Sequence, residues 1–170
     1  GNCPKCGMAL EPRTAVAAEE DNAELRDMTR RFRVSTVLAI PVLFSAMGAE
    51  FWPDLFAEFI RPRTRQWLEL ALATPVVVWG GWPFFVRGWR SLVTRNLNMF
   101  TLIGLGVAVA WSYSMVAALV PGIFPPSVFS EMGVVPVYFE AAAVITALVL
   151  LGQVLELRAR SQTNAAIKLL

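Results

Sequence analysis

The chain has 170 residues, of which 56% are hydrophobic and only 16% are charged, and its mean hydropathy is +0.54. These values exclude an ordinary soluble domain of this size and predict a membrane protein. A formal net charge of +2, with no Lys/Arg-rich block among aromatic residues, argues against a nucleic-acid partner.

The N-terminal segment 1–13 carries a Cys-x-x-Cys motif that we interpret as a metal-binding segment. Cys3 and Cys6 flank a tight turn, and Met8 follows two positions after the second sulfur. Thiolate and thioether ligands at this spacing suit Cu(I) best, and the chain has no histidine to complete a zinc site. A disulfide-forming pair and half of a zinc ribbon are the alternatives. Residues 14–33 are predicted to form a linker and helical lead-in, with no cleavable signal peptide.

Two membrane-spanning helices are predicted in the region 34–96. The first runs from Val34 to about Trp52, with Pro41 as an interior kink. A polar loop rich in acids and arginines follows it. The second span is expected to begin near Gln66.

A pair of glycines, Gly80 and Gly81, followed by Trp-Pro, is expected to break the second span. Beyond the break, a short aromatic and basic stretch is predicted to lie in the membrane interface as an amphipathic helix, with Arg87, Arg90 and Arg95 on its polar side. This platform would suit an acidic soluble partner or anionic lipid headgroups. A simple packing kink between helices is the alternative interpretation.

The region 97–170 is expected to add two more spans, which gives an all-α membrane protein with four transmembrane helices. The third covers Asn98 to Val120, and the fourth starts near Val137 and continues into a polar cytoplasmic extension. Basic residues precede span one and follow spans two and four, whereas the connection between spans three and four has none. This asymmetry places both termini in the cytoplasm. The trio Arg61, Arg63 and Arg65 opposes that orientation, but acidic residues lie near it.

Span four carries two carboxylates, Glu140 and Glu156, one near each end. Carboxylates at membrane depth are costly and therefore usually functional, and the helical rise separates these two by about 24 Å. If spans three and four are antiparallel neighbours, Met99 and Glu156 meet at the cytoplasmic side, where they would attract a soft cation. Glu140 could receive the cation on release. The alternatives are a packing or lipid-facing role for Met99 and an ion pair of Glu156 with Arg158 or Arg160.

Four stretches together resemble the N-terminal membrane portion of bacterial heavy-metal P-type ATPases of the copper(I)-exporting type. They are CPKCGMALEP, GGWPFFVRGW, NLNMFTLIGLGVAVAWSYSMVAAL and YFEAAAVITALVLLGQVLELRARSQTNAAI. The resemblance covers the chain from Cys3 to Leu170 and implies that the first two spans are a class-specific pair preceding the common P-type core. It also implies that Met99 and Glu156 form the metal entrance and that Glu140 lies on the exit pathway. The glycine kink would then be a platform for a copper chaperone or the enzyme's own metal-binding domain.

The family's TGE actuator loop, CPC transport motif and DKTGT phosphorylation loop do not occur in the 170 residues. We therefore expect part of an ATP-driven Cu(I) exporter of the bacterial plasma membrane, with the ATP and Mg²⁺ sites in domains beyond this chain. Alone, this polypeptide should not hydrolyse ATP. Its expected partners are membrane lipid and those remaining domains. The alternatives are a non-enzymatic four-helix membrane protein that binds metal or docks a partner, and a P-type ATPase for another soft or divalent metal.

Overall fold

The structure is a computed structural model that describes residues 15–167, with the side chains of all but 15–22, 57 and 163–167. Every regular element in this range is helical. The long helices are joined by a π-helical turn at Val76–Gly80 and 3-10 turns at Pro121–Ile123 and Pro126–Val128. The α-helices are α1 (Ala15–Phe51), α2 (Pro53–Phe59), α3 (Pro62–Pro75), α4 (Trp82–Val93), α5 (Met99–Leu119) and α6 (Phe139–Ile167). The predicted metal ligands Cys3, Cys6 and Met8 lie outside the described residues.

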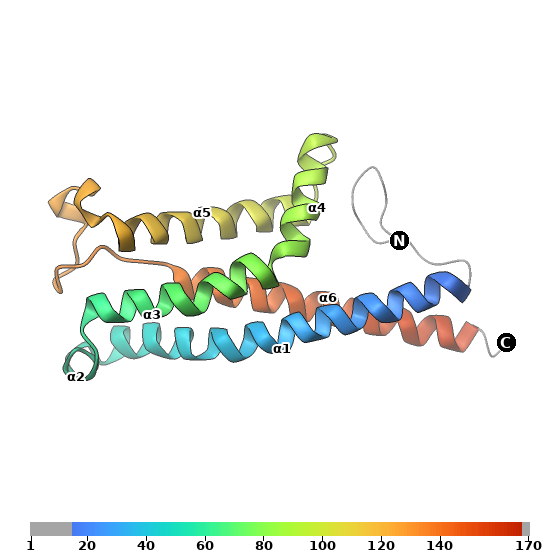
Figure 1. Cartoon of the computed structure of the whole chain (residues 1–170), viewed down its shortest axis with the longest axis horizontal. Helices are drawn as coiled ribbons and strands as arrows, with labels where there is room; N and C mark the ends of the chain where they lie inside the picture. The colour runs from blue at the N-terminus through green and yellow to red at the C-terminus, as the bar shows by residue number, and fades with distance from the viewer. Residues whose placement is uncertain (1–14, 168–170) are drawn as a thin grey trace.

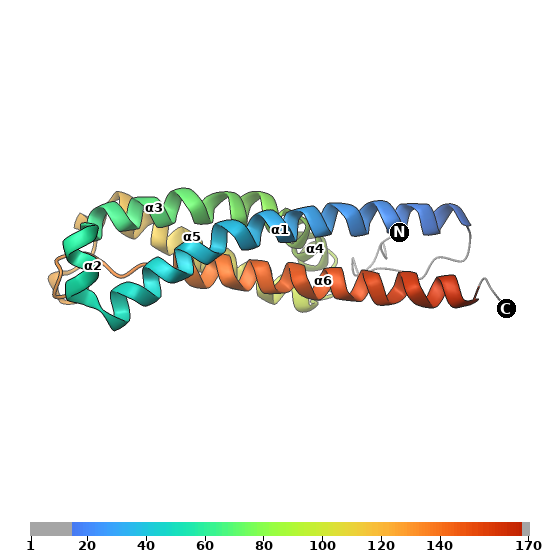
Figure 2. The same ribbon diagram turned by 90° about the horizontal axis from the view of Figure 1, so that it is seen from below.

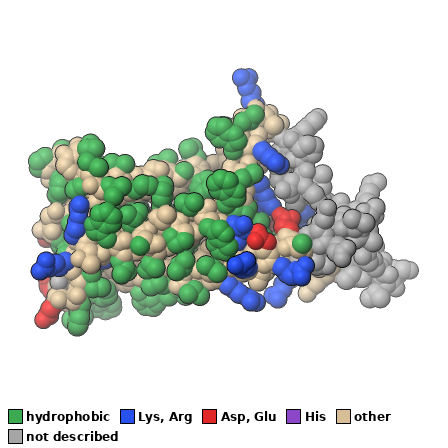
Figure 3. All heavy atoms as spheres, viewed as in Figure 1, with side chains coloured by type: hydrophobic (Ala, Val, Ile, Leu, Met, Phe, Trp, Pro, Cys, Tyr) green, Lys and Arg blue, Asp and Glu red, His purple; other side chains and the backbone are tan. Residues whose placement is uncertain are grey.

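Several helices of the described range are long and apolar enough to cross a membrane. Three of them qualify singly, namely Ala23–Phe51, Met99–Leu119 and Phe139–Gln162. A fourth crossing results if Pro62–Gly80 and Trp82–Val93, which meet at an angle of 55°, are one bent span. Apolar side chains cover the middle of the bundle in Figure 3, and charged side chains gather toward its ends. The prediction of an all-helical protein with several membrane spans is therefore confirmed.

The bundle is built on α1 and α6, which lie side by side over much of their length (Figures 1 and 2). The helices approach closely because their contacts are made by small side chains, including Ala39 of α1, Ala73 of α3 and Ala143 of α6. A second apolar cluster joins α4 to α5 and α6 through Phe84 and Phe100, whose rings stack with centroids 5.9 Å apart. This cluster fixes α4 next to the beginning of α5.

The connection between α1 and α3 differs from the prediction. The segment expected to be a polar loop contains the short helix α2, and α3 begins at Pro62, before the predicted start near Gln66. Each helix has a proline in its first turn, where the missing N–H costs nothing and the fixed φ favours the helix. Because the stretch is rich in arginine, it was predicted to be a polar loop, although these two prolines are typical of helix starts.

The bend between α3 and α4 falls at Gly81, whose N–H donates to the carbonyl oxygens of Val76 and Val77 at 3.0 and 3.1 Å. A Cβ on Gly81 would lie 2.5 Å from the Val77 carbonyl oxygen. A Cβ on Gly80 would lie 2.4 Å from Oγ of Ser35 in α1. Gly81 therefore needs glycine, because the nearest atom belongs to the backbone, whereas a side chain at position 80 would require the Ser35 hydroxyl to rotate.

Candidate functional site

Met99 and Glu156 line the same cavity, which has a volume of about 210 Å³. Asn98 caps α5 by accepting a hydrogen bond from Thr101 N at 3.1 Å, so that the helix begins at Met99. Because α6 runs antiparallel to α5 (Figure 1), Glu156 in the second half of α6 comes to the level of the beginning of α5. Met99 is 60% exposed and the Glu156 side chain 48% exposed, so both are accessible. The other lining residues are Arg87, Asn98, Phe100, Gln153 and Arg160.

The Glu156 carboxylate receives a donor on each oxygen. Its Oε1 accepts from Nη2 of Arg160 at 2.7 Å, and its Oε2 accepts from Nε2 of Gln153 at 3.1 Å. Gln153 Oε1 in turn accepts from Nη1 of Arg87 at 2.7 Å. The ion pair with Arg160 is one that the sequence also allowed. Each oxygen of the carboxylate keeps a second lone pair, so a cation can bind Glu156 while both donors stay in place.

Glu140 lies near the other end of α6, on a separate cavity of about 560 Å³. Glu69 and Gln66 of α3 also line this cavity. Glu69 is 1% exposed, and its Oε1 accepts from Oγ of Ser45 at 2.6 Å and lies 3.6 Å from Nε of Arg65. Gln66 donates to the Val135 carbonyl at 2.6 Å, while its buried Oε1 has no hydrogen-bond partner among the described residues.

Sequence reasoning overlooked Glu69. Its signal was a single carboxylate inside the otherwise apolar run WLELALATP, the same kind of signal that singled out Glu140. The predicted start near Gln66 put Glu69 in the first turn of the span, where a carboxylate is ordinarily hydrated. Because α3 begins at Pro62 and packs against α1, Glu69 is buried instead.

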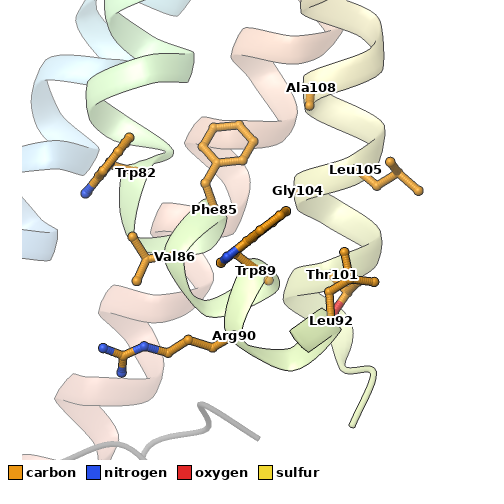
Figure 4. Close-up of a pocket in the computed structure, with 11 residues that line it drawn as sticks. Trp82, Phe85, Val86, Trp89, Arg90, Leu92, Thr101, Gly104, Leu105 and Ala108 are labelled. Atoms are coloured by element: carbon orange, nitrogen blue, oxygen red, sulfur yellow. The ribbon is translucent and has the colours of Figure 1, made fainter. Parts of the chain in front are cut away.

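The three arginines predicted on the platform lie in different surroundings. Arg90 and Arg95 are exposed, whereas Arg87 is only 6% exposed. Arg95 adopts a left-handed conformation with φ of 55°, just after α4 ends. α4 faces α5 across an apolar cavity of about 660 Å³. Arg90 is among the residues that line it, but its guanidinium points away from the cavity in Figure 4. Aromatic and small residues line this cavity, including Trp82, Phe85, Trp89, Gly104, Leu105 and Ala108.

The first cavity offers one thioether, of Met99, and one carboxylate, of Glu156, as candidate metal ligands. Among the described residues, no cluster of three or more His, Cys, Asp or Glu side chains is placed to hold a metal ion. A thioether favours a soft cation such as Cu(I), and the carboxylate adds attraction through its charge. Two ligands of this kind suit transient capture better than tight binding, because a stable site would need more donors.

Relatives of known activity match the chain closely, although no family model does. It is 58% identical over all 170 residues to a copper-exporting P-type ATPase of Legionella pneumophila, of which it covers 23%. It is 56% identical over 167 residues, 98% of its length, to a silver exporting P-type ATPase of Salmonella typhimurium, and covers 20% of it. A copper-transporting P-type ATPase of Rhizobium leguminosarum is 54% identical over the whole chain, which again covers 20%. The chain thus spans about a fifth of the length of these curated relatives.

Proposed function

Because at least 98% of the chain is homologous to copper- and silver-exporting P-type ATPases of bacteria, we propose that it forms part of the membrane domain of an ATP-driven Cu(I) exporter. Met99 and Glu156 form the metal entrance, and Glu140 lies on the release pathway. The observation that carries this proposal is the single cavity lined by both Met99 and Glu156. ATP and Mg²⁺ would be bound by other domains of the intact protein.

The two ends of α6 have complementary roles in this proposal. At the entrance, the Met99 sulfur selects a soft ion, and Glu156, which Gln153 and Arg160 hold in place, attracts that ion through its charge. At the far end, Glu140 offers only oxygen ligands, which hold Cu(I) weakly and therefore favour its release. The central transport site would be completed by helices that this chain does not contain.

The Met99→Ala and Glu156→Gln variants of the intact protein test this assignment. Each should raise the KM for Cu(I) in copper-stimulated ATP hydrolysis several-fold, because each removes one of the two groups that capture the ion. Met47→Ala is the matched control, since Met47 is an exposed methionine on α1 away from the cavity. Unchanged kinetics in both entrance variants would refute the site assignment.

The competing hypothesis is a non-enzymatic membrane protein that binds metal or docks a partner. An intact protein that binds Cu(I) but shows no copper-stimulated ATP hydrolysis would support that hypothesis instead. Stimulation by Zn(II) but not by Cu(I) or Ag(I) would favour an ATPase for a divalent metal.

The proposed platform consists of the Gly80–Gly81 bend and the exposed cations Arg90 and Arg95, with α4 lying in the membrane interface. It would dock an acidic copper chaperone or the enzyme's own metal-binding domain. Arg90→Glu with Arg95→Glu should slow turnover several-fold when an acidic protein carrier supplies copper at low salt. Copper supplied by a small chelator should give unchanged rates, because long-range attraction acts only on the charged carrier. Equal losses with both copper sources would contradict docking.

The proposed orientation places the start of α1 and the end of α6 in the cytoplasm, in a bacterial plasma membrane. These two helix ends lie at the same end of the bundle (Figure 1). Cytoplasmic and periplasmic reporter proteins fused in turn to each terminus would check the orientation.

Cys3, Cys6 and Met8 would bind Cu(I) in the N-terminal segment. Replacing both cysteines by serine should remove one Cu(I) equivalent from the intact protein.

A further inference from the structure

Arg87 joins three helices from a buried position. Its Nη1 donates to Oε1 of Gln153 in α6 at 2.7 Å, and its Nη2 pairs with the Glu24 carboxylate of α1. Its guanidinium carbon also lies 5.2 Å from the centre of the Phe100 ring in α5. A buried guanidinium is costly unless its donors are satisfied, and here named partners surround it. With 6% exposure, Arg87 has little surface to present to a docking partner.

The bond to Arg87 determines which way the Gln153 amide faces. A guanidinium only donates hydrogen bonds, so the amide oxygen of Gln153 must point to Arg87. The NH₂ group of the same amide then points to Glu156 and donates to its Oε2 at 3.1 Å. If Arg87 were absent, the amide could rotate and turn its oxygen toward the carboxylate, which would repel it.

We propose that Arg87 is a positioning residue for the metal entrance, and that it acts through Gln153 to hold Glu156 on the cavity that Met99 also lines. Arg160 holds the other carboxylate oxygen, so Glu156 is fixed from two sides. The inference rests on the proposed Cu(I) export, since it assigns a consequence to the placement of Glu156. It gives Arg87 a role distinct from that of the exposed Arg90 and Arg95.

The test compares Gln153→Met and Arg87→Met in the intact protein, with Cu(I) supplied by a small chelator. Each variant should raise the KM for Cu(I) about fivefold and leave kcat within twofold, because one hydrogen bond to a charged carboxylate is lost or misdirected. Arg87→Lys keeps a donor toward Gln153 and should retain a KM within about twofold of wild type. The control is Gln162→Met, the same substitution at an exposed position of α6.

Double variants separate positioning from a general structural role. If Arg87 acts through Gln153, the double variant Arg87→Met with Gln153→Met should have the same KM for Cu(I) as either single variant. Likewise, adding Gln153→Met to Glu156→Gln should not raise the KM further. Multiplying effects, or an unchanged KM in Gln153→Met, would overturn the proposal. Should Arg87→Met fail to fold, Gln153→Met still decides, because it leaves the ion pair between Arg87 and Glu24 in place.

Failure of the proposed function would be seen separately, as the absence of copper-stimulated ATP hydrolysis in the wild-type protein. In that case the same variants are compared by competition for Cu(I) with a colorimetric chelator. A fivefold weaker Cu(I) affinity in Gln153→Met but not in Gln162→Met would support the positioning role. Equal affinities would refute it.

Discussion

Glu140→Gln is expected to lower the kcat of the proposed copper-stimulated ATP hydrolysis of the intact protein by at least about tenfold, with little change in the KM for Cu(I). The glutamine keeps the shape of the side chain but removes the charge that would receive the ion on its way out. A tenfold loss corresponds to about 1.4 kcal/mol in the release barrier. This signature is the opposite of that expected for Met99 and Glu156, whose variants should act mainly on KM. Steady-state copper-stimulated ATP hydrolysis at several Cu(I) concentrations measures both parameters.

The control for this prediction is Glu58→Gln, which removes an exposed carboxylate from α2, at the same end of the bundle. It should leave both kinetic parameters close to those of the wild type. A Glu140→Gln variant with a raised KM and an unchanged kcat would place Glu140 in metal capture and contradict a role in release. Equal losses in both variants would indicate a nonspecific effect of charge at this end.

Gly88→Ala is expected to destabilise the contact between α4 and α5 by about 1–2 kcal/mol. A Cβ on Gly88 would lie 2.8 Å from the Phe100 carbonyl oxygen and 3.3 Å from its carbon, so the backbones of the two helices would have to separate. Overpacking of this kind typically costs about 1–3 kcal/mol, and the gain in helix propensity offsets part of it. The unfolding temperature in detergent should therefore fall by about 4 °C.

Gly104→Ala provides a control within the same pair of helices. Its Cβ would meet the nearest side-chain atom, Cδ1 of Phe85, at 3.6 Å, which is ordinary van der Waals contact. The substitution should be neutral or stabilising by up to about 1 kcal/mol, because alanine loses less backbone entropy on helix formation. Equal unfolding temperatures for the two variants would contradict the close approach at Gly88.

The residues proposed for the metal pathway differ in how far sequence could locate them. Glu140 was identifiable because a carboxylate inside an apolar run is conspicuous in the sequence itself. The meeting of Met99 and Glu156 could be anticipated from the antiparallel order of two consecutive spans. The ion pair of Glu156 with Arg160 could also be anticipated, because the two residues lie one helical turn apart. The bond from Arg87 to Gln153 could not, because these residues are separated by 66 positions and meet only through the packing of α4 against α6.

Arg87 illustrates why charge patterning alone was insufficient. In the sequence it is one of three basic residues of an amphipathic stretch, and all three were expected to face outward. In the structure, α4 packs against α5 and α6 with Arg87 turned inward, while Arg90 and Arg95 stay exposed.

The sequence by itself determined the class of this protein, the approximate position of its apolar helices and the residues whose chemistry suits a soft metal. Hydropathy is a local property summed over about twenty residues, so the spans are visible without any knowledge of the fold. Tertiary structure alone decided that Glu69 is buried beside Ser45 and that Arg87 reaches Gln153. Those placements depend on how helices distant in the sequence rotate and pack against one another, which no local pattern specifies.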